Sequence, residues 1–263
     1  MRRRRESLSS SAIHLIGAVV CTLANAPTYA AGASACTNNL LGKGVVAQVD
    51  GMTLRMSDGR EVRLSGIEPA PEPASSTDRA HDLTAGQTVT WHGDDDTPDR
   101  YGRQHGFVIL EHNGALVQAA LLRAGAAVAS GTVLNTPCSS ELTAAEAAAR
   151  EARQGLWADP HAVRNARNSD DVRAASGRFA LVEGTVLSAR QAGATFYLNF
   201  GRRWTRDFAV TVPRHVKGLF DQGGVDLKAL AGRRVRIRGW IEPHPVPRIE
   251  LRAPGQVEIL DHR

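Results

Sequence analysis

Short runs in which apolar and polar residues alternate occupy much of the chain between residues 43 and 111. The runs cover 43–50, 53–58, 60–67, 87–93 and 103–111. A period of two predicts β-strands with one buried face. The pair Asp58-Gly59 separates the second run from the third, and a two-residue loop of this composition favours a hairpin. This part of the chain is therefore predicted to be rich in β-structure.

Two stretches with helical spacing follow these strands. Residues 115–125 carry apolar side chains three and four positions apart and stop at Gly125. Residues 140–157 begin with a serine that can cap a helix, and this helix is predicted to end at Gly155. Five strands with interspersed helices predict a mainly β, α+β fold. Its expected form is a small five-stranded barrel of the OB type with helices packed on it.

The C-terminal third shows the same alternation in residues 178–190, 194–201, 207–213, 233–242 and 248–260. These runs predict a second small OB-like β-barrel over residues 177–263. Residues 159–176 contain few apolar side chains and are predicted to be a linker or a polar helix. The first globular domain is accordingly expected over residues 31–158.

The N-terminal segment has the pattern of a secretory signal. Residues 1–30 combine four arginines, an apolar stretch of about 15 residues and small residues around Ala30. Cleavage is expected near Ala30, with Ala35 as a second site. An uncleaved anchor helix is the alternative, but the stretch is shorter than the ~20 residues that cross a bilayer. The sequence thus predicts a periplasmic or secreted protein without a membrane span after cleavage.

The cysteines fit an exported protein. Cys21 would leave with the signal, so Cys36 and Cys138 remain as an even pair in an oxidising compartment. A disulfide between them is the favoured interpretation. Two unpaired thiols, or two metal ligands, are the alternatives.

Charge is distributed unevenly along the chain. Residues 31–176 hold 13 Lys and Arg against 18 Asp and Glu, whereas residues 177–263 hold 15 against 8. This difference indicates two parts with different surfaces. Basicity of the whole chain therefore gives no indication of nucleic-acid binding, whereas the C-terminal excess does.

Several motifs occur in a fixed order within residues 40–158. They are Asp50-Gly51-x-Thr53-Leu54, Val62-Arg63-Leu64-x-Gly66-Ile67, Asp99-Arg100-Tyr101-Gly102-Arg103, the stretch 116–125, and Ala145-Glu146-x-x-Ala149-Arg150 with Gly155-Leu156-Trp157. In order and spacing these motifs resemble the staphylococcal nuclease family. The resemblance implies an OB barrel that cleaves DNA and RNA with the help of calcium.

The resemblance also implies roles for individual residues. Arg63 and Arg103 match the two arginines that grip the phosphate, a task for which planar guanidinium groups are suited. Glu68 and the carbonyl of Pro69 match calcium ligands, and Asp50 matches a residue that supports the metal site. Ca²⁺ is therefore the implied cofactor.

The chain departs from the family's pattern on the metal side. Met52 stands where the family has a calcium-binding aspartate, and a thioether is not a ligand for calcium. Pro71 stands at the position of the glutamate that orients the attacking water, and Glu72 follows it. We therefore expect hydrolysis to be weak or lost, with Glu72 as the candidate that could replace the missing carboxylate.

Other interpretations of these residues stay open. Arg63 could be a solvated surface residue, Arg103 could be held by Asp99 and Tyr101, and both Glu68 and Glu72 could be exposed loop carboxylates. The run 94–96 of three aspartates is typical of a solvated turn. His105 shares a strand face with Arg103, and a packing or surface role is favoured over that of a general base.

Cationic and aromatic residues also lie close together in the C-terminal part. Arg234, Arg236 and Arg238 share one strand face with Trp240, while Arg202, Arg203 and Arg206 surround Trp204. Such a combination suits a groove for single-stranded nucleic acid. The alternative is a solvated arginine face with Trp240 at its edge or in the core. This part resembles an accessory domain that often follows nuclease domains in secreted proteobacterial proteins.

Two functions are consistent with the sequence. The first is an exported thermonuclease-like protein with a weakened phosphodiesterase site. The second is a non-catalytic module that binds a polyanion such as DNA or RNA, or a protein of the cell envelope.

Overall fold

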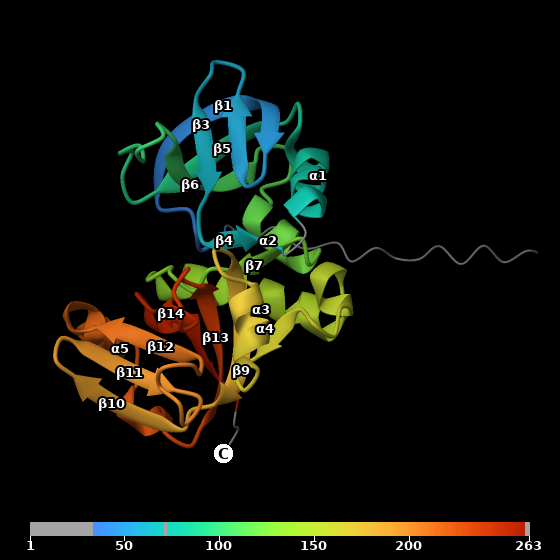
Figure 1. Ribbon diagram of the computed structural model, residues 1–263. Coiled ribbons are helices and arrows are strands. Elements are labelled where there is room, and N and C mark those ends of the chain that lie inside the picture. The colour runs from blue at the N-terminus through green and yellow to red at the C-terminus, as the bar shows by residue number, and fades with distance from the viewer. Residues whose placement is uncertain (1–33, 71–72, 261–263) are drawn as a thin grey trace, which may run out of the picture. The chain divides into compact units, whose positions relative to one another are not determined.

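A closed five-stranded barrel forms the first part of the chain in the computed structural model, which describes residues 34–70 and 73–260 (Figure 1). Neighbouring strands follow the order β1 (Asn39–Asp50), β2 (Thr53–Met56), β3 (Glu61–Leu64), β6 (Gln104–Leu110) and β5 (Thr88–Gly93), and the barrel closes between β5 and β1. The predicted OB-type barrel is therefore confirmed. The predicted signal segment, residues 1–30, lies outside the described residues.

Alternation of side chains explains the barrel. Leu54 and Met56 on β2 and Val62 and Leu64 on β3 point into a common core, and Trp91 on β5 fills its centre without exposed surface. The turn between β2 and β3 forms at Asp58-Gly59 as expected, where glycine has a φ of 89°. Apolar burial thus fixes the register of each strand, because a slip by one residue would turn its apolar face outward.

Three helices accompany the barrel: α1 (Pro73–Thr84), α2 (Val117–Arg123) and α3 (Thr136–Glu151). The predicted start of α3 at Ser140 is wrong because Asn135 caps the helix instead, its side chain accepting a hydrogen bond from the Cys138 amide at 3.0 Å. The helix also ends before Gly155, which begins the 3₁₀ helix η1 (Gly155–Ala158).

Helix α1 was not expected from the sequence. It faces the core with Ser76, Ala80 and Thr84, which are small or polar yet fully buried. The two hydroxyl groups donate to backbone carbonyls, from Ser76 to Ala126 at 2.6 Å and from Thr84 to Ala80 at 2.7 Å. A helix with this buried face has no apolar stripe to reveal it.

A two-stranded sheet lies beside the barrel. It pairs β4 (Ile67–Pro69) with β7 (Ala127–Ala129) in antiparallel register, so that Glu68 is opposite Val128. This small sheet carries Glu68 out of the barrel strand that holds Arg63. It therefore positions one side of the candidate site.

Residues 163–259 form two four-stranded sheets, here called the C-terminal sheets. One has the order β10, β11, β12, β14 and the other the order β15, β13, β9, β8. Buried Phe196, Phe208, Val210, Ile237 and Ile249 belong to their shared core. The strands are β8 (Val163–Asn165), β9 (Phe179–Thr185), β10 (Ser188–Ala192), β11 (Thr195–Asn199), β12 (Ala209–Pro213), β13 (Arg234–Trp240), β14 (Arg248–Glu250) and β15 (Val257–Ile259). The helices are α4 (Ser169–Ala174), α5 (Lys217–Gln222), η2 (Arg214–Val216), η3 (Lys228–Leu230) and η4 (Pro254–Gln256).

The expected second closed barrel is therefore not what these strands form. The predicted strand 178–190 divides into β9 and β10, which belong to different sheets. The predicted strand 248–260 divides at η4, whose first residue is a proline that cannot donate a ladder hydrogen bond. Each long alternating run thus supplies one strand to each sheet.

The segment 159–176, expected to be a linker or a polar helix, contains both a strand and a helix. Its strand β8 pairs in parallel with β9, and its helix α4 begins at an Asn168 cap. The segment therefore belongs to the C-terminal sheets. Across residues 34–70 and 73–260, no helix is both long and apolar enough to cross a membrane.

Cys36 and Cys138 form a disulfide with an S–S distance of 2.02 Å, which confirms the predicted pairing. The bridge ties the segment before β1 to the first turn of α3. Glu141 on the same helix strengthens this contact by accepting from the Ser34 hydroxyl and the Ala35 amide, each at 2.9 Å.

The disulfide should contribute strongly to stability, because the two cysteines are 102 residues apart. Replacing both cysteines by alanine is expected to lower the free energy of unfolding by about 3–5 kcal/mol, since the unfolded chain regains the freedom of a long loop. Urea denaturation of the oxidised chain and of the double variant measures the difference. Equal midpoints would contradict the role assigned to this bridge.

Candidate functional site

An open cleft of about 470 Å³ lies where β3, β4 and β6 come together. Arg63 and His105 lie side by side in it because β3 and β6 are parallel neighbours and these residues are direct partners in the register. Glu68 approaches from β4. Other lining residues are Asn38, Asp94, Asp95, Thr97, Phe107, Ser130, Thr132 and Asn135.

Arg63 is neutralised by a carboxylate from the protein itself. Its Nη2 atom lies 2.9 Å from Oε2 of Glu68, and both side chains are largely buried. Burial raises the pKa of the Glu68 carboxyl, while the Arg63 charge, a hydrogen bond from the Trp240 side chain and the nearby His105 oppose this shift. Glu68 is therefore an ion-pair partner of the phosphate-type arginine.

Arg103 is held in the same way by Asp99. Its Nε and Nη2 atoms lie 2.9 and 2.7 Å from Asp99 Oδ2, and the other carboxylate oxygen accepts the amides of Tyr101 and Arg103. These bonds, above all the one from the Arg103 side chain, hold the pKa of the Asp99 carboxyl well below its usual range. The Arg103 guanidinium also stacks 5.0 Å from the centre of the Tyr101 ring.

Asp99 links the two arginine sites. Its Oδ2 atom is 3.4 Å from Nε2 of His105, the neighbour of Arg63 across β3 and β6. The structure therefore brings Arg63, Glu68 and His105 together in the cleft and places Arg103 behind Asp99. Both arginines meet an internal carboxylate where the family would bind phosphate.

The donors in this region do not fit a calcium ion. The Met52 side chain is fully buried in the barrel core, and Asp50 is exposed at the end of β1. Glu68 is engaged by Arg63, and Pro69 follows it in β4. Pro71 and Glu72 lie outside the described residues. Within residues 34–70 and 73–260, no group of three or more His, Cys, Asp or Glu could hold a metal.

The motifs that carry these arginines also carry the match to a known family. Residues 61–159 match the family described as Staphylococcal nuclease homologue. Together with the closed five-stranded barrel, this match supports a nuclease-like family for this part of the chain. No curated protein matches the chain. The family match begins at β3, so it contains Arg63, Glu68 and Arg103 but not Asp50 and Met52.

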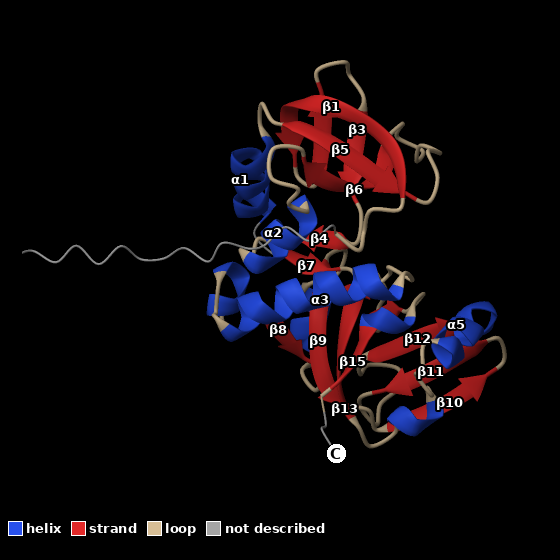
Figure 2. Ribbon diagram, turned by 180° about the vertical axis from the view of Figure 1, so that it is seen from behind, coloured by secondary structure: helices blue, strands red, loops and turns tan. Residues whose placement is uncertain are grey.

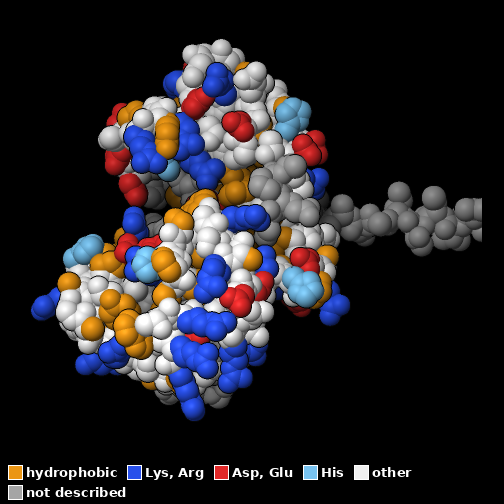
Figure 3. All heavy atoms as spheres, in the orientation of Figure 1, with side chains coloured by type: hydrophobic (Ala, Val, Ile, Leu, Met, Phe, Trp, Pro, Cys, Tyr) orange, Lys and Arg blue, Asp and Glu red, His pale blue; other side chains and the backbone are white. Residues whose placement is uncertain are grey.

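Residues 34–70 and 73–159 are here called the nuclease-like part. Next to it, on β13, lies the row of arginines that the sequence suggested as a nucleic-acid surface. Arg234, Arg236 and Arg238 do share one strand face, but Arg236 and Arg238 are buried. On the face drawn in Figure 3, Lys and Arg side chains gather near β9 and β13. Only part of this row is therefore open to solvent.

Acidic residues on the neighbouring strands explain why Arg236 can be buried. Glu183 on β9 and Glu258 on β15 are its direct partners in the register. Arg236 Nε lies 2.8 Å from Glu183 Oε1, and its Nη1 lies 2.8 Å from Glu258 Oε2. This cross-strand row satisfies the charges within the sheet.

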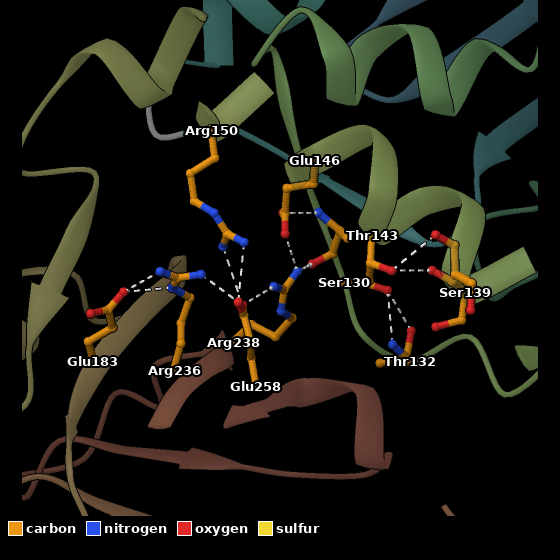
Figure 4. A network of polar contacts seen from close by, with 12 residues as sticks. Ser130, Thr132, Ser139, Thr143, Glu146, Arg150, Glu183, Arg236, Arg238 and Glu258 are labelled. Carbon is orange, nitrogen blue, oxygen red and sulfur yellow. Dashed lines mark hydrogen bonds and ion pairs between the residues drawn. The ribbon is translucent and has the colours of Figure 1, made fainter. Parts of the chain in front are cut away.

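Helix α3 of the nuclease-like part covers the same face, as Figures 2 and 4 show. Arg238 Nη1 lies 2.9 Å from Glu146 Oε2 and donates to the Ala129 carbonyl at 2.9 Å. Glu146 also accepts the Ala129 amide at 2.8 Å. Arg238 and Glu146 are each only 2% exposed, so this is a fully buried ion pair.

The nuclease-like part and the C-terminal sheets also share apolar contacts. Val128 on β7, Ala149 on α3, Trp157 on η1 and Leu181 on β9 form one buried cluster. The predicted nucleic-acid contacts Arg236 and Arg238 are thus structural, because their charges hold these elements together. The sequence signal that could have shown this is the glutamate at each facing position, Glu146, Glu183 and Glu258.

The two exposed tryptophans differ in their surroundings. Trp204 is 72% exposed in the turn between β11 and β12, next to the exposed Arg203. Trp240 is 52% exposed at the end of β13 and packs edge-to-face on Phe179, with ring centres 6.1 Å apart. The nucleic-acid role of Trp204 stays a prediction, whereas Trp240 contacts Glu68 of the cleft.

Removal of Arg238 tests the structural role of the buried pair. Arg238→Ala should lower the free energy of unfolding by roughly 3–5 kcal/mol, because it leaves the Glu146 charge buried without a partner. Arg234→Ala is the matched control on the same strand face. Its side chain is 60% exposed, so its pair with Glu183 should contribute less than about 1 kcal/mol.

Chemical denaturation of both variants measures these effects. The double variant Arg238→Met, Glu146→Gln should recover part of the loss, since it removes both charges. Equal destabilisation by Arg238→Ala and Arg234→Ala would contradict the assignment.

Asp99 should make stability sensitive to acid. Its pKa is lower in the folded protein than in the unfolded chain, so its stabilising effect is present above about pH 4 and is lost as the pH falls below that. Asp99→Asn should lower the melting temperature at neutral pH and flatten its decrease between about pH 4 and 2. Asp96→Asn, in the exposed turn nearby, is the control. Parallel melting curves for Asp99→Asn and the wild type across this range would refute the role.

Proposed function

We propose that this protein is an exported, thermonuclease-like protein that binds nucleic acid at the Arg63 cleft and has weak or no calcium-dependent phosphodiesterase activity. The Arg63–Glu68 ion pair, at 2.9 Å, carries this proposal. The family match supports nucleic acid as the ligand class. The disulfide and the signal-like pattern of residues 1–30 support export.

Glu68 affects a bound phosphate and a transition state differently. A phosphodiester that reaches Arg63 must share the guanidinium with the Glu68 carboxylate or displace it, which weakens binding but still allows it. Hydrolysis requires additional positive charge as the negative charge on the phosphate grows. An internal carboxylate at Arg63, and another at Arg103, oppose this growth. The arrangement therefore favours binding over catalysis.

The metal side adds to the loss. Met52 gives its side chain to the barrel core, and Pro71 occupies the position of the water-orienting glutamate. General acid–base and metal contributions are typically worth factors of about 10² or more each. Loss of these groups therefore reduces hydrolysis far more than it reduces phosphate binding. The alternative of an envelope-protein partner has no supporting observation among the described residues, so it is not proposed.

The variant Glu68→Gln tests this function directly. Removing the carboxylate charge leaves Arg63 free for phosphate, so affinity for a single-stranded oligonucleotide should rise roughly tenfold at low salt. The logarithm of affinity should also fall more steeply with the logarithm of salt concentration, because one more cation meets the phosphates. Fluorescence anisotropy with a labelled oligonucleotide measures both quantities.

Glu61→Gln is the matched control, because Glu61 pairs with Arg55 at 2.5 Å on the same barrel. It removes the same charge away from the cleft, so its effect should be small. Arg63→Ala should abolish the gain produced by Glu68→Gln. Equal gains for the Glu61 and Glu68 variants would mean that net charge alone sets the affinity, which would overturn the assignment of the site.

A further inference from the structure

Trp240 belongs to the C-terminal sheets but contacts the cleft of the nuclease-like part. Its side chain forms a hydrogen bond with Glu68, the carboxylate that also holds Arg63. Because the indole N–H is the only polar group of a tryptophan side chain, it is the donor. One carboxylate therefore stands between a cation and an aromatic ring.

The fold accounts for this position. Arg238, two residues before Trp240 on β13, donates to the carbonyl of Ala129 on β7. Strand β7 pairs with β4, in which Glu68 is opposite Val128. Two residues of a strand span about 6–7 Å, and residues two apart share a face. The buried Arg238 thus brings the end of β13 to the strand that carries Glu68.

Packing leaves much of the Trp240 ring unused. Phe179 meets it edge-to-face at 81°, and yet the residue is still 52% exposed. A tryptophan that served only to hold the two parts together would be expected to bury its ring, because burial of aromatic area is its main contribution to stability. The exposed ring is therefore available to a ligand.

The chemistry of the two groups defines the ligand. Arg63 offers a cation to a phosphate, and the exposed indole offers a surface on which a base can stack. Only an unpaired base can use such a surface, since the bases of a duplex are stacked on one another and must leave the helix to reach a protein ring. The combination selects a single strand over a duplex.

We propose that Trp240 completes the cleft as a base-stacking surface supplied by the C-terminal sheets, so that the ligand is a single strand of DNA or RNA whose phosphate meets Arg63. This inference rests on the proposed function of the Arg63 cleft. It assigns Trp240 to the same site as Arg63, in place of a separate groove formed by the arginines of β13.

The test compares variants of the mature full chain in binding to a labelled 12-nucleotide single strand and to the duplex of the same sequence. Trp240→Ala should weaken single-strand binding roughly tenfold or more, as expected for the loss of one stacked base. Trp240→Phe keeps an aromatic face and should lose less than about threefold. Duplex binding should change little in both variants.

Leu187→Ala is the control, because Leu187 is also 52% exposed and also belongs to the C-terminal sheets. Circular dichroism and thermal melting verify folding. Should Trp240→Ala unfold, Trp240→Leu keeps an apolar side chain without an aromatic face and replaces it in the comparison. Any of these variants that folds must show the single-strand loss.

Two results would overturn the inference while the proposed function stands. One is single-strand binding that depends on Arg63 but is as strong in Trp240→Ala as in Leu187→Ala. The other is an equal loss for single strand and duplex, which would indicate a general disturbance of the cleft. A wild-type chain that binds neither nucleic acid would overturn both the inference and the proposed function.

Discussion

The buried ion pair between Arg238 and Glu146 is the interaction on which the arrangement of this protein depends. Two charges that are each 2% exposed require well-placed partners, and the Ala129 backbone supplies them by donating to Glu146 and accepting from Arg238. This geometry fixes β13 against α3 and β7 at the same time. Since β7 pairs with β4, it also determines which residues of the C-terminal sheets reach Glu68.

A second constraint acts within the cleft. Arg63 and Arg103 occupy the positions of phosphate-binding residues, and each is compensated by a carboxylate of the chain, Glu68 or Asp99. We infer that the cleft keeps its affinity for phosphate and loses the excess positive charge that hydrolysis needs. The two constraints meet at Glu68, which bonds to Arg63 within the nuclease-like part and to Trp240 from the C-terminal sheets.

The sequence predicted the features that are local or depend on parity. Period-two alternation gave the barrel strands, and the even cysteine pair gave the disulfide between Cys36 and Cys138. It missed α1, whose buried face is small and polar, and the breaks that divide two long runs between separate sheets. The arginine row was placed on the correct strand face, but its burial was not predictable from β13 alone, because the helix that covers it lies about 90 residues earlier in the chain. Asp50, Glu72 and Trp204 remain predictions for the site.

Calcium dependence of cleavage tests the central claim most directly. The mature chain would be incubated with a fluorescent single-stranded DNA substrate over a range of calcium concentrations, with a chelator as reference and Arg103→Ala alongside. Internal compensation of both arginines predicts binding of the substrate with no cleavage stimulated by calcium. Cleavage that requires calcium and disappears in Arg103→Ala would contradict it, because both arginines would then be free to act on phosphate.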